Sequence, residues 1–166
     1  MAYILKPELL TAAAFAPFGD VIETTERDFY LINYGKTERY SDLANLDTLD
    51  NAGKPTVSIF RSQPVQFPFR IEVMERHPQS SQAFISLERK PFFTVVAPVG
   101  DQPLLGQIRL FLVGAQQGIN YRRGVWHHYM FSPEDVRDFI CLDRTGGTGN
   151  NCDEYRFSEE ILIEAC

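Results

Sequence analysis

The feature that most constrains the fold is a series of short apolar runs that begins at Thr56 and ends at Asp143. Each run is four to eight residues long and rich in β-branched and aromatic residues, which is typical of β-strands. Proline, glycine and polar residues between the runs supply turn signals. The runs are TVSIFRS, FRIEVME, QAFISL, PFFTVVAP, QIRLFLV, GINY, VWHHYMF and VRDFICLD. This spacing predicts an all-β sandwich or barrel.

The segments that flank this series differ from it. Near the start, PELLTAAAFAPFGDVIE predicts one short helix, with Thr11 as its N-cap and Pro17 just beyond its end. Residues 26–55 are polar and broken by glycine and proline, and we expect a long excursion with short strands such as DFYLINYG. The tail SEEILIEAC predicts a short C-terminal helix with Ser158 as its N-cap. With no repeat, low-complexity tract or linker in the sequence, we expect residues 1–166 to form one domain.

Composition excludes several classes of protein. A hydrophobic content of 44% with 23% charged residues is typical of a globular protein, and no apolar run approaches the ~20 residues of a membrane helix. A net charge of −6 argues against nucleic-acid binding, although a few arginines can still form a local pocket for a small anion. We see no secretory signal, and the odd set of cysteines has no CxxC pair, so we expect free thiols and a cytoplasmic location.

Polar and ionisable residues concentrate in a few places within and after the predicted strands. The segments are MERHPQSSQAF, NYRRGVWHH and DRTGGTGNNCDE, and Arg61 closes another apolar strand. Polar groups inside a barrel are costly unless they are paired or used, and convergent polar groups in an apolar concavity predict a binding site. We therefore expect these segments to meet at one site.

The adjacent histidines of NYRRGVWHH suggest a shared metal, but strand geometry argues against it. Successive residues of a strand point to opposite faces, so only one of His127 and His128 can look into the barrel. We expect His127 to face the interior and His128 to be structural, covering a barrel face or a subunit contact. Trp126 is expected to be a packing anchor. His77 also has an alternative without a functional role, because it precedes Pro78 and could simply end a strand in solvent.

Together, MERHPQSSQAF, QQGINYRRGVWHH and LDRTGGTGNNCDE resemble the signature segments of bacterial ureidoglycolate lyase, also called ureidoglycolate hydrolase. FAPFGDVIE, RDFYLINYG and ERYSDL are similar to the N-terminal part of that family, so the resemblance covers essentially the whole chain. It implies an all-β, cupin-like β-barrel or sandwich and a homodimer. It also implies a carbon–nitrogen lyase of the amidine-lyase class that splits (S)-ureidoglycolate to glyoxylate and urea in allantoin (purine) degradation.

Compared with cupins in general, the chain has an incomplete set of metal ligands. Gly124-Val125-Trp126-His127 matches the Gly-x-x-His end of the second cupin motif, and His77 fits the first motif. Gln79 stands where the next histidine is expected, and Ala83 or a neighbour replaces the glutamate. Tight zinc sites need three or four good ligands. The resemblance implies a divalent metal, nickel among those associated with the family, with His77 and His127 as candidate ligands, while the sequence itself establishes no cofactor.

The substrate that the resemblance implies carries a carboxylate, a hydroxyl and a ureido group on one carbon. Its cleavage needs a base for the hydroxyl proton and an acid for the departing urea nitrogen. Histidine suits both transfers because its pKa of ~6.5 lies near working pH, so we expect His127 as the principal acid–base group and His77 as its partner or a metal ligand. Arginine suits the carboxylate and an amide side chain suits the ureido group. The expected substrate-binding and orienting residues are Arg76, Arg61, Gln82, Asp143 and Arg144.

Two other classes of function stay open at this point. One is a non-catalytic, cupin-like binding module for a small carboxylic acid, which an incomplete metal set also fits. The other is a different cupin enzyme, such as an isomerase or a metal-dependent dioxygenase. The incomplete ligand set counts against the dioxygenase, and the acidic charge counts against a transcriptional sensor.

Overall fold

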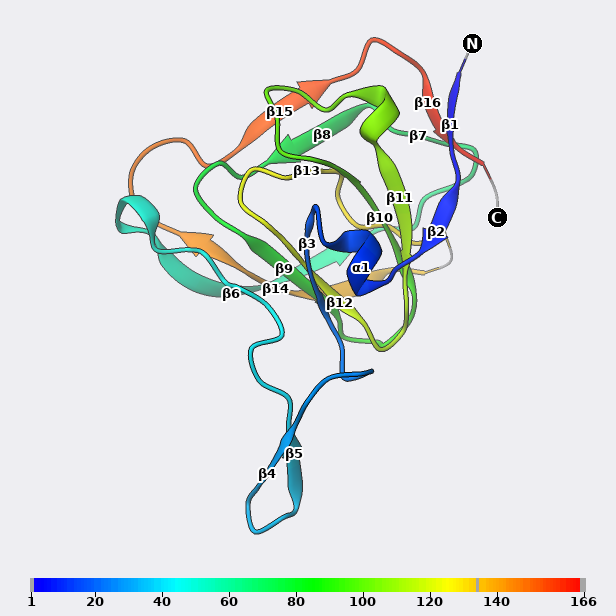
Figure 1. The fold of residues 1–166 in the computed structure, drawn as a ribbon. Helices are drawn as coiled ribbons and strands as arrows, with labels where there is room; N and C mark the ends of the chain where they lie inside the picture. Colours follow the sequence, from blue (N-terminus) through cyan, green and yellow to red (C-terminus); the bar gives the residue numbers. More distant parts are fainter. Residues whose placement is uncertain (1, 134, 165–166) are drawn as a thin grey trace.

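In the computed structural model, which describes residues 2–133 and 135–164, nearly all regular structure is β, as predicted (Figure 1). The elements are β1 (Tyr3–Leu5), β2 (Pro7–Leu9), α1 (Ala12–Phe15), β3 (Gly19–Ile22), β4 (Tyr30–Ile32), β5 (Thr37–Arg39), β6 (Lys54–Ser62), β7 (Phe69–Arg70), β8 (Val73–Arg76), β9 (Gln82–Ser86), β10 (Phe92–Ala97), β11 (Arg109–Val113), β12 (Gly118–Tyr121), β13 (Trp126–His127), β14 (Arg137–Thr145), β15 (Asp153–Arg156) and β16 (Ile161–Ile163), with short 3₁₀ turns at Asp50–Ala52 and Leu105–Gln107. Within the described residues, no helix has the length and apolar character needed to cross a membrane.

Two large sheets form the body of the molecule. One has the strand order β15-β8-β13-β10-β11-β2, and the other has the order β3-β12-β9-β14-β6. Aromatic side chains from both sheets fill the space between them, and Phe92 of the first sheet lies 4.9 Å from Phe139 of the second, centroid to centroid. This packing gives the cupin-like sandwich that the sequence predicts.

A third, smaller sheet covers the other face of the six-stranded sheet. Its strand order is β1-β16-β7, and it shares a second core with the outward face of β10 and β11. All six residues of β10 are therefore buried, with Phe92 in the first core and Phe93 in the second. Burial on both faces explains why PFFTVVAP is continuously apolar rather than alternating.

The two predicted helices have different outcomes. The N-terminal helix is confirmed as α1, and the hydroxyl of Thr11 accepts a hydrogen bond from the N–H of Ala14 at 3.1 Å. The predicted C-terminal helix is wrong, because Ile161–Ile163 form β16, which pairs in parallel with β1. Ile161 and Ile163 are buried in the second core, a period of two that a strand satisfies and a helix does not. The last two residues of the tail lie outside the described residues.

The excursion at residues 26–55 contains a hairpin that projects from the body. Figure 1 shows β4 and β5 extending well away from the two sheets, and they pair only with each other. Its turn contains Asn33 and Tyr34, both with positive φ, as tight hairpin turns require. Tyr30 and Leu31 on β4 are about half exposed or more.

Candidate active site

Three ionisable side chains, Glu75, His77 and His127, meet at one end of the six-stranded sheet. Strands β8 and β13 pair with Glu75 directly opposite His127, so the two side chains share one face. His77 lies two residues after Glu75 and points to the same side. One ligand atom from each residue can be chosen so that all three lie within 4.8 Å of one another. The register of two short strands therefore creates the group.

Backbone carbonyls fix the tautomers of the two imidazoles. Nδ1 of His127 lies 3.1 Å from the carbonyl oxygen of Val125, and Nδ1 of His77 lies 2.8 Å from that of Asn151. A carbonyl can only accept, so each Nδ1 carries a proton, and in the neutral ring Nε2 offers a lone pair.

The free nitrogens then point at other acceptors. Nε2 of His127 is buried, has no hydrogen-bond partner among the described residues, and lies 3.5 Å from a carboxylate oxygen of Glu75. Nε2 of His77 lies 3.8 Å from the same oxygen and 3.1 Å from Oε1 of Gln82. Converging acceptors are unfavourable unless a proton or a cation lies between them. The group is therefore built to hold a positive charge.

Burial sets the charge states of this group. Desolvation lowers the pKa of the fully buried His127 below its ordinary value, so the ring is neutral at neutral pH. Hydrogen bonding with His127, which Nε2 can donate when it carries a proton, is the main effect that lowers the pKa of Glu75, and the carboxylate stays ionised at neutral pH. The ring of Tyr121 stacks on His127 at 4.2 Å and 15°, and its hydroxyl is 2.6 Å from that of Thr94. The imidazole is thus held on one face by the ring of Tyr121 and at Nδ1 by the carbonyl of Val125.

Three neighbours extend the group. The amide of Gln82 donates from Nε2 to Asp143 at 3.3 Å while its oxygen faces His77, so it links the two. The thiol of Cys152 donates to Oε2 of Glu75 at 3.7 Å. Burial and then the charge of Glu75 raise the pKa of Cys152 to about 11, so the thiol is protonated at neutral pH. Of the predicted residues, the structure thus brings together His77, His127, Gln82 and Asp143.

The structure does not bring Arg76 to the group. Arg76 is adjacent to Glu75 on β8, so its side chain lies on the opposite face, as strand alternation requires. Its guanidinium lies 4.8 Å above the ring of Trp126 and donates to Asp153 at 2.9 Å and to the carbonyl of Gly100. Trp126 itself is buried, which confirms the predicted packing anchor.

The other two arginines also lie elsewhere. Arg61 is exposed on β6 and makes two hydrogen bonds to Asp138, at 2.8 and 2.7 Å. Arg144 folds over a loop, where it donates to the carbonyl oxygen of Asp50 and to Oε1 of Gln79. Neither guanidinium contacts the Glu75–His77–His127 group in the described structure.

A small cavity adjoins the group. Its volume is about 70 Å³, and its lining residues are Val73, Glu75, His127, His128, Tyr129 and Glu154. Drug-sized ligands occupy pockets of roughly 300 Å³ or more, so this cavity suits a few heavy atoms of a small substrate. Because β13 ends at His127, strand alternation does not extend to His128, and both histidines border this cavity.

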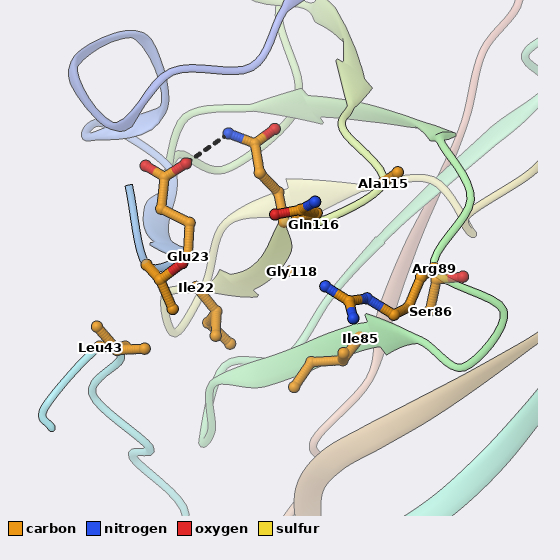
Figure 2. Close-up of a pocket in the computed structure, with 11 residues that line it drawn as sticks. Ile22, Glu23, Leu43, Ile85, Ser86, Arg89, Ala115, Gln116 and Gly118 are labelled. Carbon is orange, nitrogen blue, oxygen red and sulfur yellow. Dashed lines mark hydrogen bonds between the residues drawn. The ribbon is translucent and has the colours of Figure 1, made fainter. Parts of the chain in front are cut away.

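A second cavity, of about 180 Å³, lies at the far end of the five-stranded sheet (Figure 2). It adjoins Ser86, whereas Gln82 begins the same strand, four residues or about 13 Å away. Figure 2 shows Glu23 and Arg89 on opposite sides of this cavity, and Glu23 is engaged by Gln117 at 2.7 Å. No histidine or cysteine lines it among the described residues, so we place the chemistry at the smaller cavity.

The carboxylate of the group, Glu75, is the residue that the sequence comparison with cupins missed. That comparison looked for a glutamate after His77, near Ala83, whereas the structure supplies one two residues before it. The signal was the spacing of two residues between Glu75 and His77, which places both on one face if the strand continues to His77; β8 ends one residue earlier, at Arg76, and the two side chains still meet.

The sequence of this chain matches known proteins over nearly its full length. Residues 2–164 match the family model described as ureidoglycolate lyase. A protein named ureidoglycolate lyase from Pseudomonas aeruginosa (strain LESB58) is 51% identical over 156 residues, which cover 94% of this chain and 92% of that protein. Another with this name, from Pseudomonas putida (strain W619), is 49% identical over 159 residues, which cover 96% of this chain and 95% of that protein.

Proposed function

The chain belongs to the ureidoglycolate lyase family, and we propose that it cleaves ureidoglycolate to glyoxylate and urea at the Glu75–His77–His127 group. The observation that carries this assignment is the buried lone pair on Nε2 of His127, which has no partner among the described residues and borders the small cavity. Family membership supports the substrate, and this lone pair supports the assignment of His127 as the base.

The reaction moves one proton from oxygen to nitrogen. The hydroxyl of ureidoglycolate loses its proton as its carbon becomes the aldehyde of glyoxylate, and the carbon–nitrogen bond breaks. The bonding electrons leave with the nitrogen, which takes up a proton to give urea. One base can serve both transfers, because the proton it removes from oxygen is the proton that nitrogen needs.

His127 is suited to this transfer. Its ring is neutral at neutral pH, and Nδ1–H is tied to the backbone, so Nε2 is free to accept the hydroxyl proton. The imidazolium that forms lies 3.5 Å from the carboxylate of Glu75, which stabilises its charge. We assign His77 as the partner of His127, and Gln82, oriented by Asp143, to the ureido oxygen.

The same three residues fit a divalent ion. Glu75, His77 and His127 offer one oxygen and two nitrogens, and a carbonyl holds the other nitrogen of each ring, as is common for metal-bound histidine. When bound, such an ion, nickel in the resemblance above, would supply a Lewis acid for the carboxylate and hydroxyl oxygens of the substrate. An ion is also a suitable anchor because Arg61 and Arg76 face away from the group.

One assay separates the two assignments of the His127 lone pair, which can bind a proton or an ion but not both. Purified protein is incubated with ureidoglycolate, and glyoxylate and urea are measured before and after removal of metal with a chelator. Release that survives chelation assigns the lone pair to proton transfer. Release that is lost and then restored by added Ni²⁺ assigns it to the ion. Binding of glyoxylate without any release would instead indicate the non-catalytic binding module.

We further propose that the protein is a cytoplasmic homodimer. An isolated two-stranded hairpin is only marginally stable in water, yet β4–β5 projects from the body with exposed apolar side chains, among them Leu31 and Tyr34. We take a second copy of the chain as the partner that covers this hairpin, and the free thiols Cys141 and Cys152 agree with a reducing compartment. Light scattering during gel filtration tests the dimer, and a monomeric mass would exclude it.

A further inference from the structure

His128 borders the reacting group although the sequence predicts a structural position for it. Its side chain is one of those that line the cavity of about 70 Å³, together with Glu75 and His127. Its backbone N–H donates to the carbonyl of Val95 at 3.0 Å, which holds this segment against β10. Two imidazoles and the carboxylates of Glu75 and Glu154 therefore surround one small space.

Aromatic neighbours fix the orientation of this ring. Phe69 and Phe131 approach it edge-on, at centroid distances of 5.6 and 5.8 Å. Nδ1 lies 2.9 Å from the carbonyl oxygen of Tyr129, so it carries the proton and donates. Nε2 has no hydrogen-bond partner among the residues that the structure describes, and it is not one of their fully buried unpartnered atoms, although His128 as a whole is only 3% exposed. The lone pair on Nε2 is thus left at the accessible edge of the cavity.

The cavity is consequently rich in acceptors. Because Nδ1 of His128 carries the proton donated to Tyr129, Nε2 of the neutral ring accepts rather than donates. The other polar lining groups include the carboxylates of Glu75 and Glu154 and Nε2 of His127. A ligand that satisfies these groups must bring N–H or O–H donors, and a bare carboxylate cannot.

We propose that Nε2 of His128 accepts an N–H of the ureido group and so selects ureido-bearing substrates. This inference rests on the proposed cleavage of ureidoglycolate. The substrate carries donors only on its hydroxyl and its ureido nitrogens, and the hydroxyl is assigned to His127. The ureido N–H groups are the donors that remain for His128, while Gln82 serves the ureido oxygen. His128 is then a specificity-determining residue.

Two substrate fragments test this role as competitive inhibitors of ureidoglycolate cleavage. N-carbamoylglycine keeps the ureido group and the carboxylate but lacks the hydroxyl, whereas glycolate keeps the hydroxyl and carboxylate but lacks the ureido group. His128→Phe removes the lone pair and suits the aromatic surroundings of the ring. We expect this variant to raise the inhibition constant of N-carbamoylglycine about 10-fold and to leave that of glycolate unchanged.

His128→Gln is the matched control, because its side-chain oxygen can replace the lost acceptor and should restore most of the affinity for N-carbamoylglycine. Equal weakening of both inhibitors in a folded His128→Phe protein would show a merely structural role and overturn the inference. So would failure of N-carbamoylglycine to inhibit the unmodified enzyme. Failure of the proposed function is distinct, because it appears as no cleavage by the unmodified protein.

Discussion

At the scale of single residues, the site depends on which nitrogen of each histidine carries the proton. Backbone carbonyls hold Nδ1 of His77, His127 and His128 as donors, so all three rings turn Nε2 towards other side chains or the cavity. Residue type and strand context in the sequence are enough to predict His77 and His127 as site residues. The carbonyl contact of His77 could not be predicted in the same way, because its partner, Asn151, lies 74 positions away in the sequence.

The charge of Glu75 should control the reactivity of Cys152. Replacing the carboxylate by an amide in Glu75→Gln removes one of the groups that raise the thiol pKa to about 11, so the pKa should fall. Alkylation of Cys152 by iodoacetamide at pH 8, followed by peptide mass spectrometry, should therefore become faster. Buried Cys141 is the internal control and should stay unreactive. An unchanged alkylation rate at Cys152 would contradict the contact with Glu75.

Replacing Arg61 or Arg76, which the sequence predicts to bind the substrate carboxylate, should not affect substrate binding. Arg61→Ala removes an exposed ion pair, so KM should stay within about twofold of that of the unmodified enzyme and stability should be essentially unchanged. Arg76→Ala removes the contact with Trp126 and should cost stability, roughly 1 kcal/mol, with KM unchanged. Steady-state kinetics and thermal unfolding measure both effects. A tenfold rise in KM in either folded variant would restore that arginine as an anchor.

At the scale of elements, strands β6 to β14 were largely predictable because their residues are β-branched, aromatic and bounded by turn signals. The terminal strands were missed because each is three residues long and is defined by a distant partner, as β1 is by β16. In the tail, the local preference for a helix after Ser158 is outweighed by the burial of Ile161 and Ile163 in the second core. The pairing of β8 with β13, which creates the site, likewise joins segments about 50 residues apart and leaves no local signal.

The hydrogen bond between the hydroxyls of Tyr121 and Thr94 joins the two large sheets beneath His127. Tyr121→Phe keeps the ring that stacks on His127 but leaves a buried hydroxyl behind, which should cost about 1–3 kcal/mol of unfolding free energy. Thr94→Val should cost a similar amount, and the double variant should be less destabilised than the sum. Denaturant unfolding of all four proteins measures this coupling. Strictly additive losses would show that the two hydroxyls do not interact.

At the scale of the whole molecule, the six-stranded sheet contributes residues to both hydrophobic cores. We therefore expect the two cores to unfold together. His128 packs against Phe131 of the second core and lines the cavity, and its burial makes folding depend on pH. Its pKa falls from 6.5 to about 4 in the folded state. Above pH 6.5 both states are neutral, and below it the unfolded chain binds a proton that the folded chain does not.

The free energy of unfolding should consequently fall as the pH is lowered from 6.5 towards 4. The loss of unfolding free energy attributable to His128 reaches about 3 kcal/mol near pH 4, because each unit by which its pKa is lowered corresponds to ~1.4 kcal/mol. Denaturant unfolding at several pH values measures it, with His128→Phe as the comparison. The variant should show a shallower dependence over this range, and an identical slope in both proteins would contradict the buried neutral state.

The central claim is that the lone pair of His127 is essential for cleavage, and turnover of ureidoglycolate by His127→Asn tests it most directly. Glyoxylate and urea release by the variant should fall by roughly 100-fold or more, because the group that moves the proton is lost. Circular dichroism and thermal unfolding should show that the variant is folded. A folded His127→Asn protein with the turnover of the unmodified enzyme would contradict the account.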